Sequence, residues 1–429
     1  MSANPGPASL ADVVLRLPAP GERRIALRVT PAAERALRQG HPWVFAESIR
    51  RQSRDGAPGD LAIAFDHERG FLAAGLYDPN SPIRLLALQH GKPAQIDERW
   101  FRSRLGEAVA ARSPLLTSET TGCRLVHGEN DGLPGLIVDC YAQTLVLKLY
   151  TSAWVPHLRT FAAALQQEFP AERLLLRLGR SALRFPELLH GLTDGAALWG
   201  PELAGPVTFL ENGLRFEADP RLGHKTGFYL DQRENRARAE RLAQGKSVLN
   251  VFAYTGAFAL YAARGGARTV VSVDISRPAL EAAGRNFDLN RHVPAVAAAE
   301  HATLVEDAFA ALERLGRARR RFDLVILDPP AFANQRAGVK RALDAYTRLT
   351  FLALGVLRRS GTLVFASCTR QVSADAFFEA VHLAARRAGR PLRDIERTGH
   401  PLDHPVRFKE GAYLKCLFAE LEYAAASSL

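Results

Sequence analysis

The C-terminal half of the chain alternates regularly between strand-like and helix-like segments. Strand-like runs of Val, Ile and Leu lie at 247–252, 269–274, 302–306, 322–328 and 361–367. Helical patterns follow them, at 256–264, 277–290, 308–319, 338–358 and 373–388. Such continuous apolar runs are typical of parallel strands that helices cover on both faces. The pattern therefore predicts a doubly wound sheet from about residue 207 onward, closed by a hairpin of 392–396 and 413–420.

Two segments of different character precede this region. Residues 22–97 contain short β runs broken by turn signals, with one short helix at Ala32–Arg38. Residues 98–203 mix helical stretches with strand-like runs, which suggests a small α+β insert. The prolines of Pro201–Pro206 favour a boundary there. A length of 429 residues agrees with two or three domains, and we expect three, at 22–97, 98–203 and 204–429.

Composition excludes several classes of protein. The chain is 47% hydrophobic and 24% charged, which is typical of globular proteins. It has no apolar run of about 18 residues, so no membrane span is expected. Its first 20 residues lack a basic start followed by an apolar block, so no secretory signal is expected. The four cysteines form no C-x-x-C pair, so neither a metal site nor a disulfide framework is predicted, and a reduced, cytoplasmic setting fits best.

The net charge of +11 and the pI of about 9.8 raise the question of a nucleic-acid partner. Seven of the 56 basic residues are lysines, which leaves 49 arginines. This excess of arginine, together with abundant alanine, is also typical of a compositional bias. Charge alone therefore leaves RNA binding open.

The ends of the first three strands carry residues suited to a cofactor, because ligands of doubly wound sheets bind outside the carboxyl ends of the strands. The turn Tyr254-Thr255-Gly256 leads into a helix, so backbone at Gly256 could approach the ligand and helix N–H groups could face its carboxylate. Asp274 ends the next strand, at a spacing that suits a carboxylate accepting both ribose hydroxyls. Asp307 follows the third strand and could accept from an adenine amine. The glycine pattern is no full G-x-G-x-x-G, which disfavours a nicotinamide-dependent oxidoreductase.

The next two strands end in groups that can react. Asp328-Pro329-Pro330 ends the fourth strand, and its prolines hold the chain extended where it leaves the sheet. Cys368 follows the fifth strand, between Ser367 and Thr369. Taken singly, such an aspartate is often a cap and such a cysteine is often a buried core thiol. Together, beside a nucleotide-like cofactor, they indicate methyl transfer onto a pyrimidine carbon, for which the thiolate is the reactive form.

Several longer motifs occur in the order of a known family. They are His41-Pro42-Trp43-Val44-Phe45, Gly128–Gly135, Gly223–Arg233, Asn250–Phe258, Asp328-Pro329-Pro330, Ser367-Cys368, Asp403-His404-Pro405 and Glu410–Lys415. With them, the C-terminal half resembles a class I S-adenosylmethionine-dependent methyltransferase. Over nearly all of 22–420 the chain resembles the bacterial large-subunit (23S) rRNA cytosine-C5 methyltransferases that carry an N-terminal PUA domain.

The resemblance implies a multidomain α/β protein. Residues 22–97 would be a β-rich PUA-like RNA-binding domain, 98–203 a small α+β central domain, and 204–429 a Rossmann-like class I methyltransferase sheet. The implied cofactor is S-adenosyl-L-methionine, and the implied partner is the rRNA of the large ribosomal subunit rather than a membrane. A homodimer is left open. The implied cofactor-binding residues are Phe228, Asp231, Gln232, Arg233, Asn250, Phe252, Tyr254, Thr255, Gly256, Asp274, Ser276, Asp307 and Asp328, with Phe228–Arg233 closing over the cofactor.

The resemblance also makes Cys368 the nucleophile. Attack of its thiolate on carbon 6 of cytosine would give carbon 5 the electron density that it needs to take a methyl group. Asp328 could hydrogen-bond the N3/N4 edge of the base, which must be unpaired or flipped out. Nothing in the sequence names the base that removes the carbon 5 proton. Cys123, Cys140 and Cys416 are interpreted as structural.

The chain departs from the family pattern at two positions, and other activities stay open. Thr369 stands where a second serine is common and keeps a hydroxyl, whereas Ala331 stands where lysine is often found and changes an expected substrate contact. An amino-group RNA methyltransferase could use Asp-Pro-Pro, but such enzymes usually have an aromatic residue where this chain has Ala331. A uracil-C5 methyltransferase would use the same thiol. A cofactor-binding RNA module without catalysis is disfavoured by Cys368 and Asp328.

Overall fold

The computed structural model describes residues 14–333 and 335–422, and the chain divides into two compact units. The first unit comprises Met1–Gly213, Ala218–Leu230 and Leu402–Gly411. The second comprises Leu214–Glu217, Asp231–Pro401 and Ala412–Leu429. Two later segments of the chain therefore fold with its N-terminal half. No helix in the described ranges is long and apolar enough to cross a membrane.

The first unit begins with a six-stranded sheet of order β2-β6-β5-β4-β1-β3. Its strands are β1 (Ile25–Val29), β2 (Trp43–Phe45), β3 (Ile49–Gln52), β4 (Leu61–Phe65), β5 (Phe71–Tyr77) and β6 (Ile83–His90). The helix α2 (Pro31–Arg38) starts at Thr30, whose hydroxyl accepts from the Ala33 N–H. This arrangement confirms the β-rich N-terminal domain predicted from the sequence.

A five-stranded sheet of order β11-β10-β9-β8-β7 follows in the same unit. It contains β7 (Gly122–His127), β8 (Leu136–Tyr141), β9 (Thr144–Leu149), β10 (Arg173–Leu178) and β11 (Ala197–Trp199), with helices α3 (Glu98–Arg112), α4 (Leu158–Glu168) and α5 (Arg180–Leu183). Buried Leu61 and Leu86 of the first sheet belong to the same apolar core as Phe101 and Trp154. Because they share this core, the two sheets are parts of one folded unit, and the α+β character of the central region is confirmed.

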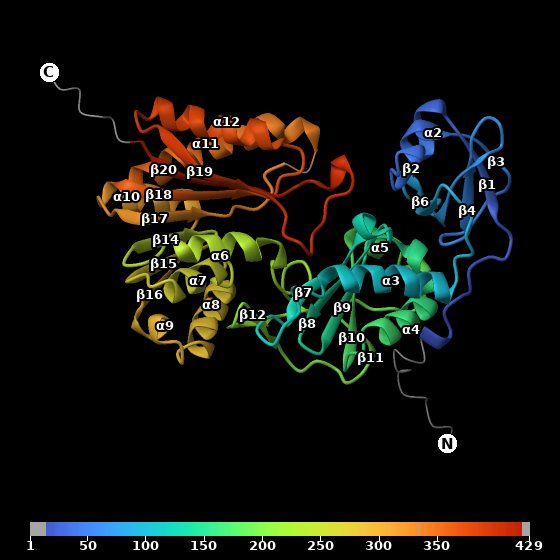
Figure 1. Cartoon of the computed structure of the whole chain (residues 1–429), viewed down its shortest axis with the longest axis horizontal. Helices are drawn as coiled ribbons and strands as arrows, with labels where there is room; N and C mark the ends of the chain where they lie inside the picture. The colour runs from blue at the N-terminus through green and yellow to red at the C-terminus, as the bar shows by residue number, and fades with distance from the viewer. Residues whose placement is uncertain (1–13, 334, 423–429) are drawn as a thin grey trace. The chain divides into compact units, whose positions relative to one another are not determined.

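The second unit is built on a seven-stranded sheet of order β16-β15-β14-β17-β18-β20-β19 (Figure 1). Its strands are β14 (Ser247–Val251), β15 (Thr269–Asp274), β16 (Glu300–Val305), β17 (Phe322–Leu327), β18 (Leu357–Ser367), β19 (Leu392–Thr398) and β20 (Lys415–Leu421). The first five are parallel, and β20 is antiparallel to both of its neighbours. The Rossmann-like sheet predicted from the alternating pattern is therefore confirmed. The chain reaches this sheet through a two-stranded ribbon of β12 (Val207–Glu211) and β13 (Leu214–Ala218).

Helices cover both faces of the seven-stranded sheet. They are α6 (Arg233–Arg241), α7 (Ala257–Arg264), α8 (Arg277–Leu289), α9 (Pro294–Ala298), α10 (Ala308–Arg317), α11 (Val339–Val356) and α12 (Ala374–Arg387). Leu249 and Val251 pack in one core with α10, α11 and α12. Successive residues of a strand face opposite sides, so the buried Val248 and Asn250 face the side on which α7 and α8 pack. Burial on both sides explains the near-continuous apolar strands of the sequence.

The predicted closing hairpin has the right pairing but no tight turn. β19 and β20 are antiparallel neighbours, as the sequence predicted. The chain between them is long, and its Leu402–Gly411 portion belongs to the first unit. The Asp403-His404-Pro405 motif lies in this segment, so its residues belong to the first unit rather than to the hairpin.

Candidate active site

The loop after β14 has an unusual backbone. Phe252 and Tyr254 have φ values of 60° and 47°, which non-glycine residues rarely adopt. Strain of this kind persists where surrounding contacts hold it, and it is frequent at ligand sites. Gly256 also has a positive φ of 74°, and a Cβ at this position would lie 2.6 Å from the Ala283 Cβ of α8. Close packing against α8 is thus a reason for glycine at this position, and the approach of a ligand stays a prediction.

Asp274 holds this loop with its carboxylate. Its Oδ2 accepts from the Tyr254 N–H at 2.8 Å, and its Oδ1 accepts from the Ser276 N–H at 2.9 Å. Ser276 in turn caps α8 by accepting from the Ala279 N–H. Each carboxylate oxygen can accept more than one hydrogen bond, so ribose hydroxyls could still bind Asp274.

Two buried side chains beside this loop have polar atoms that the described residues do not satisfy. Asn250 is 1% exposed, and within the described ranges neither its amide nitrogen nor its amide oxygen has a hydrogen-bond partner. The same holds for the hydroxyl of Thr255, which is also buried. Leaving such groups unpaired costs about 1–3 kcal/mol each, and native proteins rarely do so. A polar ligand that supplies partners to Asn250 and Thr255 therefore fits this site.

Asp307 has a structural role that the sequence left open. It is the N-cap of α10, and its Oδ1 accepts from the N–H groups of Phe309 and Ala310 at 3.0 and 3.1 Å. The residue is exposed at the end of β16. Its contact with an adenine amine stays a prediction.

A chain of buried side chains orients Asp328 at the end of β17. Asp328 Oδ1 accepts from Gln232 Nε2 at 2.8 Å, and Gln232 Oε1 accepts from Asn235 Nδ2 at 2.6 Å. The Thr398 hydroxyl donates to Asn235 Oδ1 at 2.6 Å. Because Gln232 and Asn235 are buried, this chain restricts the carboxylate of Asp328. Gln232 thus has a structural role, and its contact with the cofactor, expected from the sequence, stays a prediction.

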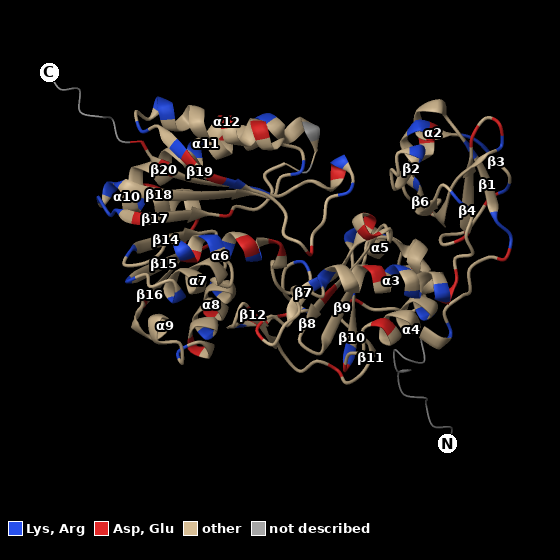
Figure 2. Cartoon of the chain, viewed as in Figure 1, with Lys and Arg blue, Asp and Glu red and all other residues tan. Residues whose placement is uncertain are grey.

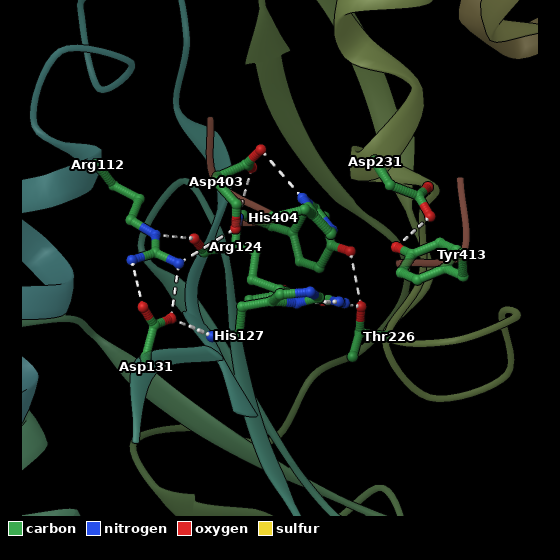
Figure 3. Close-up of polar contacts among 11 residues, drawn as sticks. Arg112, Arg124, His127, Asp131, Thr226, Asp231, Asp403, His404 and Tyr413 are labelled. Atoms are coloured by element: carbon green, nitrogen blue, oxygen red, sulfur yellow. Dashed lines mark hydrogen bonds and ion pairs between the residues drawn. The ribbon is translucent and has the colours of Figure 1, made fainter. Parts of the chain in front are cut away.

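The other residues of the Phe228–Arg233 motif are divided between the two units. In the second unit, Asp231 Oδ2 accepts from the Tyr413 hydroxyl at 2.8 Å (Figure 3). Arg233 is buried at the first position of α6. Phe228 belongs to the first unit, where its ring lies 5.1 Å from that of Phe209. Closure of these residues over the cofactor stays a prediction.

Cys368 lies directly after β18, next to the Asp-Pro-Pro segment. β17 and β18 are parallel neighbours, so their ends meet at one edge of the sheet. The Cys368 Sγ lies 3.9 Å from the carbonyl oxygen of Pro329, and the Phe332 N–H donates to the Thr369 hydroxyl at 3.2 Å. Cys368 is half-buried, whereas Cys123, Cys140 and Cys416 are buried. The structure thus brings the predicted thiol and the predicted carboxylate segment together.

Tyr346 of α11 was not found from the sequence. Its hydroxyl is hydrogen-bonded to Ser367 Oγ at 2.8 Å and to Thr369 Oγ1 at 2.6 Å, so it holds both neighbours of Cys368. Burial raises the pKa of Tyr346, so the phenol stays neutral at pH 7. The hydroxyl that Thr369 shares with the serine common in the family therefore forms a hydrogen bond with Tyr346. The only signal in the sequence was a tyrosine in the apolar stripe of a helix.

Lys415, the last residue of the Glu410–Lys415 motif, lies at the start of β20. Its amine donates to the carbonyl oxygens of Thr369, Val372 and Tyr413 at 2.5, 2.8 and 3.1 Å. Its Cα is paired with that of Ser367 across the two strands. Burial lowers the pKa of Lys415 to about 8, while Cys368 acts in the opposite direction. We call residues 368–372, which these bonds fix, the Cys368 turn.

The Asp403-His404-Pro405 motif forms a different kind of cluster, in the first unit (Figure 3). Asp403 Oδ2 accepts from the Arg124 N–H at 3.0 Å, and His404 Nδ1 lies 3.0 Å from Asp403 Oδ1. Arg112 donates to both carboxylate oxygens of Asp131, at 2.9 and 2.6 Å, and to the Asp403 carbonyl at 3.3 Å. We call these five residues the Asp403 network. It fixes the Leu402–Gly411 segment within its unit.

A second anchor holds Thr226, in the part of the Gly223–Arg233 motif that belongs to the first unit. Arg124 donates to both carboxylate oxygens of Asp139, at 2.7 and 2.9 Å. The Thr226 hydroxyl donates to Asp139 and is hydrogen-bonded to the Tyr141 hydroxyl at 3.0 Å. These contacts give Thr226 a structural role. Among the residues that the structure describes, no group of three or more His, Cys, Asp or Glu could hold a metal ion.

Comparison with known proteins agrees with the observed fold. Residues 124–419 match the model of the S-adenosylmethionine-dependent methyltransferase family, and residues 27–88 match a PUA-like domain. A relative from Deinococcus radiodurans, named ribosomal RNA large subunit methyltransferase, is 48% identical over 94% of this chain and 99% of its own. Another from Pseudoalteromonas translucida, named ribosomal RNA large subunit methyltransferase I, is 36% identical over 90% of this chain and 97% of its own.

Solved structures share the fold at lower identity. A candidate methyltransferase from Streptococcus mutans is 23% identical, with a TM-score of 0.78 over 92% of this chain and 99% of its own. The structure of SMU.776, a candidate methyltransferase complexed with S-adenosylhomocysteine (SAH), gives a TM-score of 0.79 at 23% identity over the same shares. The chain therefore belongs to the S-adenosylmethionine-dependent methyltransferase family, as its motifs indicated, and its cofactor is S-adenosylmethionine.

Proposed function

We propose that this protein methylates carbon 5 of a cytosine in the large-subunit (23S) ribosomal RNA, with Cys368 as the covalent nucleophile. The names of the relatives from Deinococcus radiodurans and Pseudoalteromonas translucida support the RNA substrate. The observation that carries the chemistry is the place of Cys368. It is half-buried at a strand end and its sulfur lies 3.9 Å from the Pro329 carbonyl oxygen, beside Asp328.

The proposed reaction begins at the thiol. The Cys368 thiolate adds to carbon 6, a sulfur–carbon bond forms, and the electrons of the ring double bond become available at carbon 5. S-adenosylmethionine, when bound, would supply the methyl group: carbon 5 forms a bond to the methyl carbon while the bond from that carbon to the sulfonium sulfur breaks, which releases S-adenosylhomocysteine. Loss of the carbon 5 proton to a base then expels the Cys368 thiolate and restores the double bond. We assign this base to no residue beside Cys368. In the proposal, solvent or a group of the RNA accepts the carbon 5 proton.

Asp328 favours cytosine over uracil as the target base. A carboxylate only accepts hydrogen bonds, and the cytosine edge offers an amine at N4 where uracil offers a carbonyl oxygen at O4. Gln232 orients Asp328 by donating to its Oδ1 at 2.8 Å. We therefore assign Asp328 to the exocyclic amine of the flipped-out base, and the uracil-C5 alternative is disfavoured.

Amino-group methylation is disfavoured by the residues after Asp-Pro-Pro. The residue directly after the second proline is Ala331, which is exposed and offers no aromatic ring. The next residue, Phe332, packs its ring 5.3 Å from that of Tyr346. Phe332 is therefore used to build the Cys368 turn, and an enzyme that methylates an amine has no need of that thiol.

The cofactor is assigned to the loop after β14 and the ends of β15 and β16. Asn250, Thr255 and Asp274 are proposed to hydrogen-bond it, because their polar atoms are buried without partners or carry further acceptor capacity. Contacts from Phe252, Tyr254, Gly256, Ser276 and Asp307, and from the Phe228–Arg233 motif, belong to the same proposal. The domain boundaries near residues 97 and 203 also remain proposals.

RNA binding is assigned to the PUA-like domain and the central region. Figure 2 shows Lys and Arg on both units, with Asp and Glu among them, so charge alone marks no single RNA surface. Removing residues 1–97 would be a poor test, because Leu61 and Leu86 share a core with Phe101 and Trp154. The salt dependence of RNA affinity is a better one. Affinity should fall steeply with salt concentration as phosphate contacts release counterions, and a flat response would argue against this surface.

Trapping of the adduct tests the proposal. A large-subunit rRNA fragment with 5-fluorocytosine at the target should form a covalent complex with the wild-type protein, because fluorine cannot leave as a proton does. The same RNA should form no complex with Cys368→Ser, since a serine hydroxyl is not ionised near pH 7. The control variant Cys123→Ser, altered at a buried thiol of β7, should still be trapped. A complex formed equally by Cys368→Ser would contradict the thiol mechanism.

A further inference from the structure

A buried lysine fixes the turn that carries the proposed nucleophile. Two of its three acceptors, the carbonyls of Thr369 and Val372, belong to the Cys368 turn, and the third, that of Tyr413, lies on its own segment. Lys415 is 5% exposed and is paired with Ser367, the residue before Cys368. The amine therefore ties both sides of the nucleophile to β20.

The charge of this lysine is not balanced by an acid. Within residues 14–333 and 335–422, Lys415 forms no ion pair, and its three partners are neutral carbonyl groups. Burial of an unpaired ammonium is costly, and proteins seldom keep one without a use. Carbonyl oxygens accept from an ammonium but cannot neutralise it. A thiolate at Cys368 would supply the missing negative charge.

The interaction between these two groups is reciprocal. Cys368 acts to raise the pKa of Lys415, against the effect of burial. Whatever free energy an anionic sulfur contributes to the ammonium, the ammonium must contribute to the anionic sulfur. At pH 7 a lysine with a pKa of about 8 is still mostly charged, so the effect is present under ordinary conditions.

We propose that Lys415 is a positioning residue for the nucleophile, whose ammonium fixes the Cys368 turn and favours the thiolate form of Cys368. The proposal rests on the role given to Cys368 under the proposed function. It makes Lys415 neither a general base nor a cofactor ligand, because all of its donors point to backbone carbonyls.

The other groups around Cys368 do not supply this charge. Tyr346 is neutral at pH 7, since burial raises its pKa. Asp328 precedes Pro329, whose carbonyl contacts the Cys368 sulfur, and its carboxylate would disfavour a thiolate. Arg370 is exposed, so water screens its charge. Lys415 is a buried cation whose charge interacts with the thiol.

The pH dependence of thiol alkylation measures this effect without RNA. The full-length protein would be treated with iodoacetamide from about pH 5 to pH 9, and modification of Cys368 followed by peptide mass spectrometry. The other three cysteines are buried and should react slowly, so the signal is specific. Lys415→Met removes the charge and keeps the length of the side chain, whereas Lys415→Arg keeps the charge.

We expect Lys415→Met to raise the midpoint of Cys368 alkylation by one pH unit or more and to slow alkylation at pH 7 about tenfold. Lys415→Arg should restore most of the wild-type profile. Tyr346→Phe is the matched structural control, because it removes hydrogen bonds to Ser367 and Thr369 without a change of charge. It should move the midpoint much less. If Lys415→Met does not fold, Lys415→Gln retains donors for the carbonyls and gives the same comparison.

An unchanged midpoint in the neutral variants would overturn the proposal. So would a shift of equal size in Tyr346→Phe, because disorder of the turn would then explain the result. These outcomes are separate from the adduct experiment. A trapped RNA adduct with no shift of the midpoint rejects the role of Lys415 alone, and a clear shift without an adduct rejects the role of Cys368 in methylation.

Discussion

The Asp403 network and the Cys368 turn both involve buried charged side chains. The two regions differ in whether an oppositely charged side chain neutralises the buried charge. In the network, Arg112 donates to both oxygens of Asp131, and both side chains are almost fully buried. In the turn, Lys415 is held by three neutral carbonyls and has no acidic partner among the described residues. Asp274 resembles Lys415 in that neutral backbone groups hold its charged group: its carboxylate accepts from two backbone N–H groups.

This difference separates structural charges from functional ones. A buried pair that satisfies itself fixes the chain but offers little to a ligand, and removing one partner leaves a costly charge behind. Neutral backbone groups do not neutralise a single charge that they hold. Such a charge can therefore still act electrostatically on a ligand or a reacting group, and it can form further hydrogen bonds where its atoms allow them. We therefore expect the network to determine stability, and Lys415 and Asp274 to determine reactivity and cofactor affinity.

The largest effect on stability is expected from Asp131→Ala. It leaves the Arg112 guanidinium buried without its carboxylate, and such a change costs about 3–5 kcal/mol. Chemical denaturation would measure the free energy of unfolding. The double variant Arg112→Met with Asp131→Leu should recover part of the loss, because no buried charge remains. A loss below about 1 kcal/mol for Asp131→Ala would break the comparison.

Asp274→Ala should weaken S-adenosylmethionine binding by about 1–3 kcal/mol, the usual value for lost charge-assisted hydrogen bonds. The loop after β14 would also lose the acceptor of the Tyr254 N–H. Titration calorimetry would measure the affinity, with circular dichroism as a check on folding. Unchanged affinity in a folded variant would remove Asp274 from the cofactor site.

The pH dependence of stability should reveal the single buried charge of Lys415. Its pKa is lowered from 10.5 to about 8, so between these values the unfolded chain binds more protons than the folded one. Stability therefore gains a favourable contribution as the pH rises from about 8 to about 10.5, and Lys415→Met lacks it. The difference in unfolding free energy between the two proteins, measured across this range, should move in favour of the wild type. A constant difference would mean that the ammonium carries no burial penalty.

The smallest effect is expected at an exposed ion pair. Asp288 of α8 and Arg291, which follows the end of that helix, lie 3.2 Å apart, with side chains 68% and 64% exposed. Solvent screens such a pair, so Asp288→Ala should change the free energy of unfolding by less than about 1 kcal/mol. The same denaturation measurement serves as the baseline for Asp131→Ala. A loss comparable to that of Asp131→Ala would show that burial does not control the energetics of these pairs.

The sequence predicted the elements whose periodicity is strong. The strand Thr269–Asp274 has the predicted bounds, since its run of β-branched residues leaves little choice. β5 (Phe71–Tyr77) and β7 (Gly122–His127) were missed, because small residues and one charged residue interrupt their apolar pattern. Pairing of β19 with β20 was predicted, but the transfer of Leu402–Gly411 to the first unit depends on tertiary contacts.

The residues of the candidate site also divide into those that local sequence pattern predicts and those that depend on tertiary contacts. Positions at strand ends, such as Asp274 and Cys368, could be predicted, because parallel strands bring their carboxyl ends to one edge of the sheet. Tyr346 and Lys415 were missed as site residues, since each interrupts an otherwise apolar pattern with one polar tip, and its partners lie far away in the sequence. Such contacts follow from the packing of α11 and β20 rather than from local pattern.

Identification of the methylated nucleoside tests the central claim most directly. Large-subunit rRNA from a strain that lacks the enzyme would be incubated with the protein and S-adenosylmethionine, digested to nucleosides and analysed by mass spectrometry. We predict 5-methylcytidine as the product with the wild-type protein, and none with a Cys368→Ser variant that still binds the cofactor. An N-methylated nucleoside, or an undiminished yield from Cys368→Ser, would contradict methylation of carbon 5 through the thiol.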